Sequence, residues 1–184
     1  KALSTAIFLK DVDIFAIQEL STAFVKDFRH RMALLGWQHS TVPVSSGLFP
    51  TWTAGIKLAS SGVVVFSKHP IEYYDSIVYN ADCSGADCLA SKGVVYCRIN
   101  VGGRVVNILA THAQAWDSEV GHRVRLAQFS QCASFIRALA IPQDEPLILM
   151  GDLNSDGISR RKQLDELLRV TNMQAIPLEI GSPL

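Results

Sequence analysis

The sequence predicts an α/β domain in which helices cover a mixed β-sheet. Short apolar runs bounded by Gly or Pro alternate with amphipathic helical stretches along the chain. Two of these runs, residues 93–100 and 105–112, are joined by a Gly-Gly pair that favours a hairpin turn. Hairpin-linked strands combined with long helices indicate a layered α/β domain with a mixed sheet.

The first strand and helix are predicted within residues 13–36. Residues 13–17 form a short apolar strand, and a helix over residues 21–35 begins at Ser21 as N-cap. Gly36 ends this helix. Its apolar face has amphipathic spacing and consists of Phe24, Phe28, Met32 and Leu35.

The middle of the chain is predicted as loop followed by strands. Residues 38–61 contain two prolines and two glycines and are expected to form loops and short strand pieces. Residues 62–66 are rich in valine and are expected to form a buried strand. The hairpin strands at 93–100 and 105–112 follow.

Two further helices flank a strand near the end of the chain. A helix over residues 119–140 is stopped by Pro142 and has an apolar face made of Leu126, Phe129, Ala133 and Ile136. Residues 147–150 form a buried strand. A helix over residues 159–170 follows, with Leu164, Leu167 and Leu168 facing inward.

Composition places the chain among single globular domains. Its 184 residues are enough for one core-forming domain, and 48% of them are hydrophobic. The formal net charge is zero, whereas nucleic-acid binders usually carry a basic excess, so we expect no nucleic-acid partner. No apolar stretch has the length of a membrane span. The chain begins at Lys1 without a signal-peptide pattern, so we expect it to be trimmed and its compartment to be undefined.

Four cysteines divide into two groups. Cys83 and Cys88 lie in a Gly-containing loop, where they could form a small disulfide, remain free thiols or pair with a partner. Their spacing does not suggest zinc, because no second cysteine or histidine pair accompanies them. Cys97 and Cys132 fall on a predicted strand and helix, so we expect both to be small core residues.

The sequence GDLN at residues 151–154 ends the strand at 147–150 with two polar side chains. Residues i and i+2 of extended backbone point to the same side, so Asp152 and Asn154 would offer hard oxygen ligands to one site. Such ligands suit Mg²⁺ or phosphate chemistry. The alternative is a simple turn, because Asp, Asn and Gly favour turns.

Polar residues follow two other predicted strands as well. Gln18 and Glu19 end the first strand, and His112 and Gln114 end the strand at 105–112. Ligand sites of open α/β sheets gather at strand ends, so these side chains are predicted to share one site with Asp152. The alternatives are that Glu19 stabilises a helix N-terminus and that His112 is a satisfied core histidine.

The shared site would support phosphoryl chemistry. Glu19 and Asp152 can hold a hard divalent ion, which polarises a phosphoryl group. His112 and Asn154 can donate hydrogen bonds to phosphoryl oxygens. A general base to activate water is missing, because the other histidines lie on predicted helices or loops away from carboxylates at strand ends. These histidines are His30, His39, His69 and His122.

Several stretches resemble the endonuclease/exonuclease/phosphatase superfamily. Residues 13–19 (DIFAIQE) look like its metal-glutamate strand, and residues 151–154 look like its Gly-Asp-x-Asn strand. Within the superfamily the chain is most similar to the neutral sphingomyelinases. Residues 92–96 (KGVVY) and 111–115 (THAQA) carry this similarity most specifically, and residues 61–68 carry it more loosely.

The resemblance implies a DNase I-like fold, a four-layer α/β/β/α sandwich of two mixed sheets. It also implies Mg²⁺-dependent hydrolysis of sphingomyelin to ceramide and phosphocholine, with Mn²⁺ as another usable cation and a membrane phospholipid as substrate. Glu19 is implied as metal ligand. His112, Asp152 and Asn154 are implied to act on the phosphate. Lys92 and Asp87 are implied to lie near the substrate, whereas the alternative for Lys92 is a solvated charge at a strand start.

The family pattern also contains parts that residues 1–184 do not match. An early strand with a metal-assisting Asn and a final Asp-His pair, whose His is the general base, would lie outside the chain. We therefore expect residues 1–184 to form a single domain that lacks the family's first and last strands. Such a domain should bind metal weakly and turn over slowly.

Other functions and contacts remain open at this point. The aromatic loop at residues 48–52 could insert at a membrane interface, where Trp is favoured, or pack beneath a long loop. A lipid substrate favours a secreted or membrane-associated protein. The alternatives to a lipid phosphodiesterase are another superfamily phosphoesterase, such as a nuclease or inositol-phosphate phosphatase, and a non-catalytic interaction module.

Overall fold

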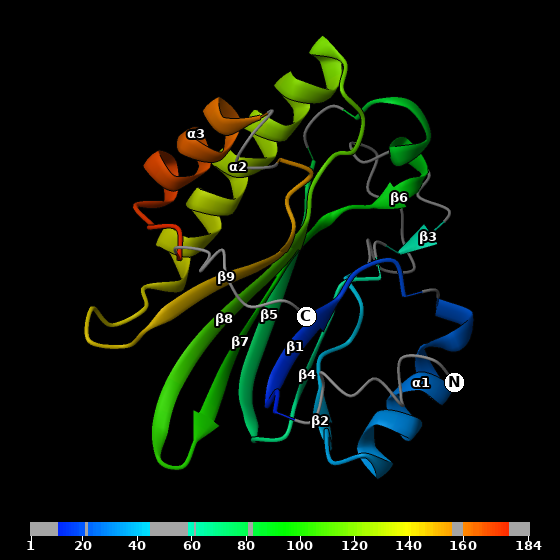
Figure 1. Ribbon diagram of the computed structural model, residues 1–184, viewed down its shortest axis with the longest axis vertical. Helices are drawn as coiled ribbons and strands as arrows, with labels where there is room; N and C mark the ends of the chain where they lie inside the picture. Colours follow the sequence, from blue (N-terminus) through cyan, green and yellow to red (C-terminus); the bar gives the residue numbers. More distant parts are fainter. Residues whose placement is uncertain are drawn as a thin grey trace.

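A computed structural model describes residues 11–20, 22–44, 59–60, 62–80, 83–155 and 160–176. Two β-sheets dominate this part of the chain (Figure 1). The smaller sheet has the order β1-β4-β2 and contains β1 (Ile14–Ile17), β4 (Val64–Ser67) and β2 (His39–Ser40). The larger has the order β5-β7-β8-β9 and contains β5 (Ile71–Val78), β7 (Gly93–Val101), β8 (Arg104–His112) and β9 (Leu147–Asp152).

The larger sheet is mixed, as predicted. Strands β7 and β8 form the expected hairpin, with Val101 opposite Arg104 across the Gly-Gly turn. Strand β9 pairs parallel to β8, because helix α2 (Glu119–Leu139) carries the chain back between them. A third, minor pairing joins β3 (Ala59–Ser60) to β6 (Ala90–Ser91), which follows the short helix η3 (Gly85–Leu89).

The two larger sheets pack face to face over the main core. Alternate residues of each strand point to opposite faces of a sheet. Val63 and Val65 on one sheet therefore meet Val95, Cys97 and Ile108 on the other in a fully buried apolar layer. The intervening residues Val64 and Phe66 point outward and are equally buried, so the outer face of this sheet is also covered.

Helices provide that cover and complete four layers (Figure 1). Helix α1 (Thr22–Leu34) places Met32 against Val64 and Phe66. Helix α2 covers the outer face of the larger sheet, where Cys132 and Phe135 contact Tyr96 and Leu109. Helix α3 (Arg161–Thr171) packs on α2 through Leu167 and Phe129. The predicted α/β/β/α sandwich of DNase I type is therefore confirmed. Only the larger sheet is mixed, however, because both described pairings of the smaller sheet are antiparallel.

Some sequence predictions differ from the structure in detail. On α1, Phe24 is 67% exposed while Val25 is buried, because the buried stripe is rotated towards Met32. Leu35 lies just beyond the end of α1 and is 47% exposed. On α2, Leu126 is exposed because Arg125 and Gln128 occupy inward positions. Strand β5 is an element that the sequence analysis does not predict. The predicted N-cap Ser21 and the aromatic loop at residues 48–52 lie outside the described residues.

Cysteine chemistry follows the fold. Cys83 and Cys88 form a disulfide, which settles the three alternatives for this pair. Cys97 and Cys132 are free and buried in the cores on either face of the larger sheet, as predicted. Burial raises the pKa of Cys97 to about 12 and that of Cys132 to about 11. Among the helices of the described part, none is long and apolar enough to cross a membrane.

Thiol titration tests this assignment. At pH 8 we expect the native, unreduced protein to react slowly with a thiol reagent, because both free cysteines are buried and protonated. Denaturation without reductant should expose two thiols, and reduction should raise the number to all four cysteines. Four thiols in denatured, unreduced protein would show that Cys83 and Cys88 are not bonded.

Candidate phosphate and metal site

The three polar strand ends meet at one place. His112 is the last residue of β8 and lies opposite Asp152, the last residue of β9, in the parallel register. The Nε2 atom of His112 is 3.9 Å from Oδ2 of Asp152 and 3.9 Å from Oε1 of Glu19, which follows β1. Two carboxylates from different sheets therefore flank one buried imidazole.

Glu19 reaches this place because the backbone turns sharply after β1. Its φ angle is 59°, in the left-handed region, and its side chain is 81% exposed. The next residue, Leu20, donates its N–H to the carbonyl of Gly62 at 3.3 Å. A Cβ atom on Gly62 would lie 2.1 Å from the Leu20 nitrogen, so only glycine permits this approach.

Asp152 and Asn154 form a turn that also faces the site. Extended backbone ends at Asp152, because Asn154 has a φ angle of 49° and its N–H donates to Oδ1 of Asp152 at 2.9 Å. The turn interpretation is therefore correct, and the expected extended arrangement of the pair is wrong. The Asn154 side chain nevertheless donates to the carbonyl of Ala113, directly after His112, at 3.0 Å.

Lys92 lies behind His112 as a buried ammonium group. Its side chain is 6% exposed, which excludes the alternative of a solvated charge at a strand start. The Nζ atom lies 3.1 Å from Oδ2 of Asp87, 2.8 Å from the Ala113 carbonyl and 3.0 Å from Nε2 of His112. Burial lowers the pKa of Lys92 below its ordinary value, and the Asp87 carboxylate opposes that shift.

The contact with Lys92 concerns the tautomer of His112. Nζ of Lys92 lies 3.0 Å from Nε2 of His112, and the donor and acceptor roles of the ring depend on its tautomer. An ammonium group has donors and no lone pair, so with Lys92 as the donor the ring is neutral and carries its proton on Nδ1.

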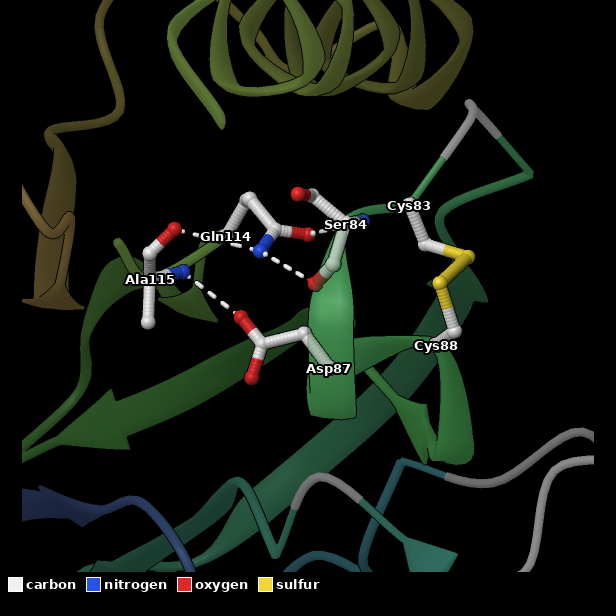
Figure 2. Close-up of a disulfide and its surroundings, with 6 residues drawn as sticks. All are labelled: Cys83, Ser84, Asp87, Cys88, Gln114 and Ala115. Atoms are coloured by element: carbon white, nitrogen blue, oxygen red, sulfur yellow. Dashed lines mark hydrogen bonds between the residues drawn. A yellow bond between two sulfur atoms is a disulfide. The ribbon is translucent and has the colours of Figure 1, made fainter. Parts of the chain in front are cut away.

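The disulfide loop supplies Asp87. Figure 2 shows the Cys83–Cys88 bond beside the short helix η3, which turns the Asp87 carboxylate towards the segment after His112. The N–H of Ala115 donates to Oδ2 of Asp87 at 2.7 Å. The Gln114 side chain accepts from the N–H of Ser84 at 3.2 Å and donates to its carbonyl at 3.0 Å.

Two carboxylates and their surroundings fit a partly hydrated divalent ion. Glu19 and Asp152 converge on His112 from an exposed side, with side chains 81% and 50% exposed. Mg²⁺ characteristically keeps several waters and takes only one or two protein carboxylates. The described residues contain no group of three or more His, Cys, Asp or Glu side chains placed to enclose a metal.

One histidine–carboxylate pair is not predicted from the sequence. Nε2 of His122, on α2, bonds to Oδ1 of Asp117 in the loop before that helix. This hydrogen bond and the charge of Arg160 lower the pKa of Asp117. Arg160 also donates to the carbonyl of Asn154 at 2.7 Å, so the pair is connected to the turn beside the site. The signal in the sequence that could have predicted this pair is the i, i+5 spacing of Asp117 and His122 across the start of a helix.

Comparison with known proteins identifies the family of this chain. The family model described as "Endonuclease/Exonuclease/phosphatase family" matches residues 1–172, so the chain belongs to this family. Sphingomyelinase C 2 of Leptospira interrogans is 31% identical over 166 residues, which cover 84% of this chain and 26% of the relative. The chain therefore spans about a quarter of the length of this relative.

Solved structures show the same fold. Sphingomyelinase C from Streptomyces griseocarneus superimposes with a TM-score of 0.79 at 30% identity, covering 92% of this chain and 60% of that one. A mutant of beta toxin from Staphylococcus aureus, crystallised with bound magnesium ions, has a TM-score of 0.82 at 22% identity. The superposition covers 95% of this chain and 62% of the beta toxin chain.

Replacement of Gly62 tests the backbone that presents Glu19. Gly62→Ala should lower the free energy of unfolding, measured with urea, because the new Cβ meets the Leu20 backbone. Gly102→Ala is a matched control, since Gly102 has the same φ of 61° and nothing within 4 Å of its Cβ position. We expect about 1 kcal/mol for the control and about 1–3 kcal/mol more for Gly62→Ala. Equal losses would contradict the close approach.

A double-mutant cycle tests the buried ion pair. Lys92→Met should lower the free energy of unfolding by about 2–4 kcal/mol, because it leaves the buried Asp87 carboxylate without its partner. Asp87→Asn should lower it less in the Lys92→Met protein than in wild type. The exposed pair Lys68–Asp13 has nearly the same distance, 3.2 Å, and serves as control. Its coupling should stay below about 1 kcal/mol. A similarly small coupling between Lys92 and Asp87 would refute the account of this pair.

Proposed function

We propose that this chain is part of a metal-dependent phosphodiesterase that hydrolyses sphingomyelin to ceramide and phosphocholine. The observation that carries the proposal is the convergence of Glu19, His112 and Asp152, with His112 Nε2 3.9 Å from both carboxylates. A hard cation and a phosphate group need this combination of carboxylates and polarisable donors. The sphingomyelinase relatives and the magnesium ions of the beta toxin structure support the choice of substrate and metal.

Glu19 is the residue we assign to the metal. Its exposed carboxylate belongs to a residue with left-handed backbone, and Asp152 lies at the same distance from Nε2 of His112. When bound there, Mg²⁺ or Mn²⁺ would polarise the phosphoryl group and offset its negative charge. Asp152 would share the charge of the cation and fix the turn that carries Asn154.

Lys92, His112 and Asn154 are assigned to the phosphate. One N–H of the Asn154 amide donates to Ala113, and we assign the second to a phosphoryl oxygen. The Lys92 ammonium holds the His112 ring in place at 3.0 Å and contributes positive charge behind it. Because this charge is buried, it stabilises developing negative charge more strongly than an exposed lysine would.

By the family resemblance, the general base would belong to an Asp-His pair that residues 1–184 do not match. Residues 1–184 would then supply the metal and phosphate side of the site. The Cys83–Cys88 bond supports an oxidising compartment, and thus a secreted or membrane-surface location for an enzyme acting on membrane phospholipid.

Phosphocholine release from sphingomyelin vesicles by the full-length protein tests the proposal. Release should require Mg²⁺ or Mn²⁺, and Glu19→Gln should reduce it by about 10²-fold or more, since a metal supplies several kcal/mol of transition-state stabilisation. Glu119→Gln, an exposed carboxylate at the start of α2, is the matched control and should retain activity.

A parallel assay with supercoiled DNA separates the lipid reaction from a nuclease reaction. We expect no nicking, because the chain has no excess of basic residues. Nicking without phosphocholine release would overturn the proposed substrate. Unchanged phosphocholine release by Glu19→Gln would overturn the metal assignment.

A further inference from the structure

Arg125 is a fully buried arginine in the first half of α2. It is the largest side chain in the described part of the chain with essentially no exposed surface. No carboxylate of the described residues forms an ion pair with it. Burial lowers the pKa of Arg125, which reflects the cost of removing a guanidinium group from water. A cation is kept in such a place only if its contacts offset that cost.

Its contacts are concentrated on one short backbone segment, residues 114–116. Nη1 of Arg125 lies 2.7 Å from the carbonyl of Gln114, 3.3 Å from that of Ala115 and 2.9 Å from that of Trp116. Nε donates to the Gln163 side chain on α3 at 2.7 Å. Three consecutive carbonyls thus turn towards one cation, and the fourth contact fixes the guanidinium plane.

The segment would not adopt this bend without support. Trp116 has a φ angle of 70°, a left-handed conformation that is strained for a bulky residue, and its ring is largely exposed. The Trp116 carbonyl passes so close to α2 that a Cβ on Gly121 would lie 2.8 Å from it. A second hydrogen bond connects the segment to the same helix, because the Gln128 side chain accepts from the N–H of Gln114 at 2.8 Å.

The opposite edge of the segment holds the phosphate site together. The Ala115 N–H donates to Asp87, which pairs with Lys92. Immediately before the segment, the Ala113 carbonyl accepts from both Lys92 and Asn154. Rotation of these peptides would therefore move the partners of Lys92 and the phosphate-facing amide of Asn154 together.

We infer that Arg125 is a positioning residue of the phosphate site. Its guanidinium group holds the carbonyls of residues 114–116 on the α2 side, and so presents Ala113 and Ala115 to Lys92, Asp87 and Asn154. The inference rests on the proposed phosphodiesterase function. The buried guanidinium charge of Arg125 makes no contact with the carboxylates of the site. The inference explains why this charge is nevertheless kept, by assigning it a role in the reaction. A lysine in its place would reach fewer carbonyls at once, because it lacks the planar fork of donors.

The test uses full-length protein with Arg125→Met and Arg125→Lys, and Arg123→Met as control. Arg123 lies two residues away on the same helix and is exposed. We expect Arg125→Met to lower kcat for phosphocholine release by roughly 10²-fold with KM changed by less than about threefold, because misplaced groups slow chemistry more than binding. Arg125→Lys should lose less, and Arg123→Met should match wild type.

Folding is followed separately, by urea unfolding and by the amide NMR resonances of Gln114 and Ala115. Both resonances should shift in each Arg125 variant and stay unchanged in Arg123→Met. If Arg125→Met does not fold, the kcat of Arg125→Lys for phosphocholine release tests the inference instead. A further variant, Arg125→Ala, should recover activity when methylguanidinium is added to fill the vacated space. Wild-type kcat in a folded variant whose Ala115 resonance has moved would overturn the inference.

Failure of the proposed function gives a different pattern. Wild-type protein that releases no phosphocholine would overturn that function without reference to Arg125. The amide resonances of Gln114 and Ala115 then decide the inference, recorded with and without phosphocholine. Resonances in folded Arg125→Met that match those of wild type, or no response of the wild-type resonances to phosphocholine, would overturn the positioning role.

Discussion

The buried ammonium group of Lys92 is the contact on which the rest of the site depends. It connects the disulfide loop through Asp87, the end of β8 through Ala113 and His112, and indirectly the β9 turn through the shared Ala113 carbonyl. A charge with so little exposure is tolerated only where each of its donors finds an acceptor. Any rearrangement of one segment therefore leaves a buried charge or carbonyl unsatisfied, which keeps the segments in one arrangement.

The four-layer fold makes this meeting point available. Helix α2 returns the chain so that β9 runs parallel to β8, and both strands deliver polar residues to the same edge. Packing of the two sheets over the Val65 and Ile108 layer brings the end of β1, with Glu19, to that edge. Helices α2 and α3 then support the segment after His112 from behind, through Arg125 and Gln163. Fold and site are thus built from the same contacts.

Much of this arrangement could be predicted from sequence, for identifiable reasons. Polar residues at the ends of apolar strands identify Glu19, His112 and Asp152, because the periodicity of strands is strong and sheets align their ends. Lys92 and Asp87 were accessible only through family resemblance, since a lysine at a strand start is usually solvated. Arg125 and the Ala113 carbonyl had no sequence signal: hydrophobic patterning assigns charged residues to the surface, and backbone groups are invisible to it. The same patterning assigned Leu126 to the apolar face of α2, whereas the structure exposes it.

The protonation of His112 tests the central claim most directly. The account predicts that Lys92 donates to Nε2, so that the neutral ring carries its proton on Nδ1. Nitrogen-15 NMR of histidine-labelled protein at pH 8 distinguishes the two tautomers. We predict an unprotonated Nε2 and a protonated Nδ1 for His112. A proton on Nε2 would mean that Lys92 does not donate to the ring, and would contradict the account of the site.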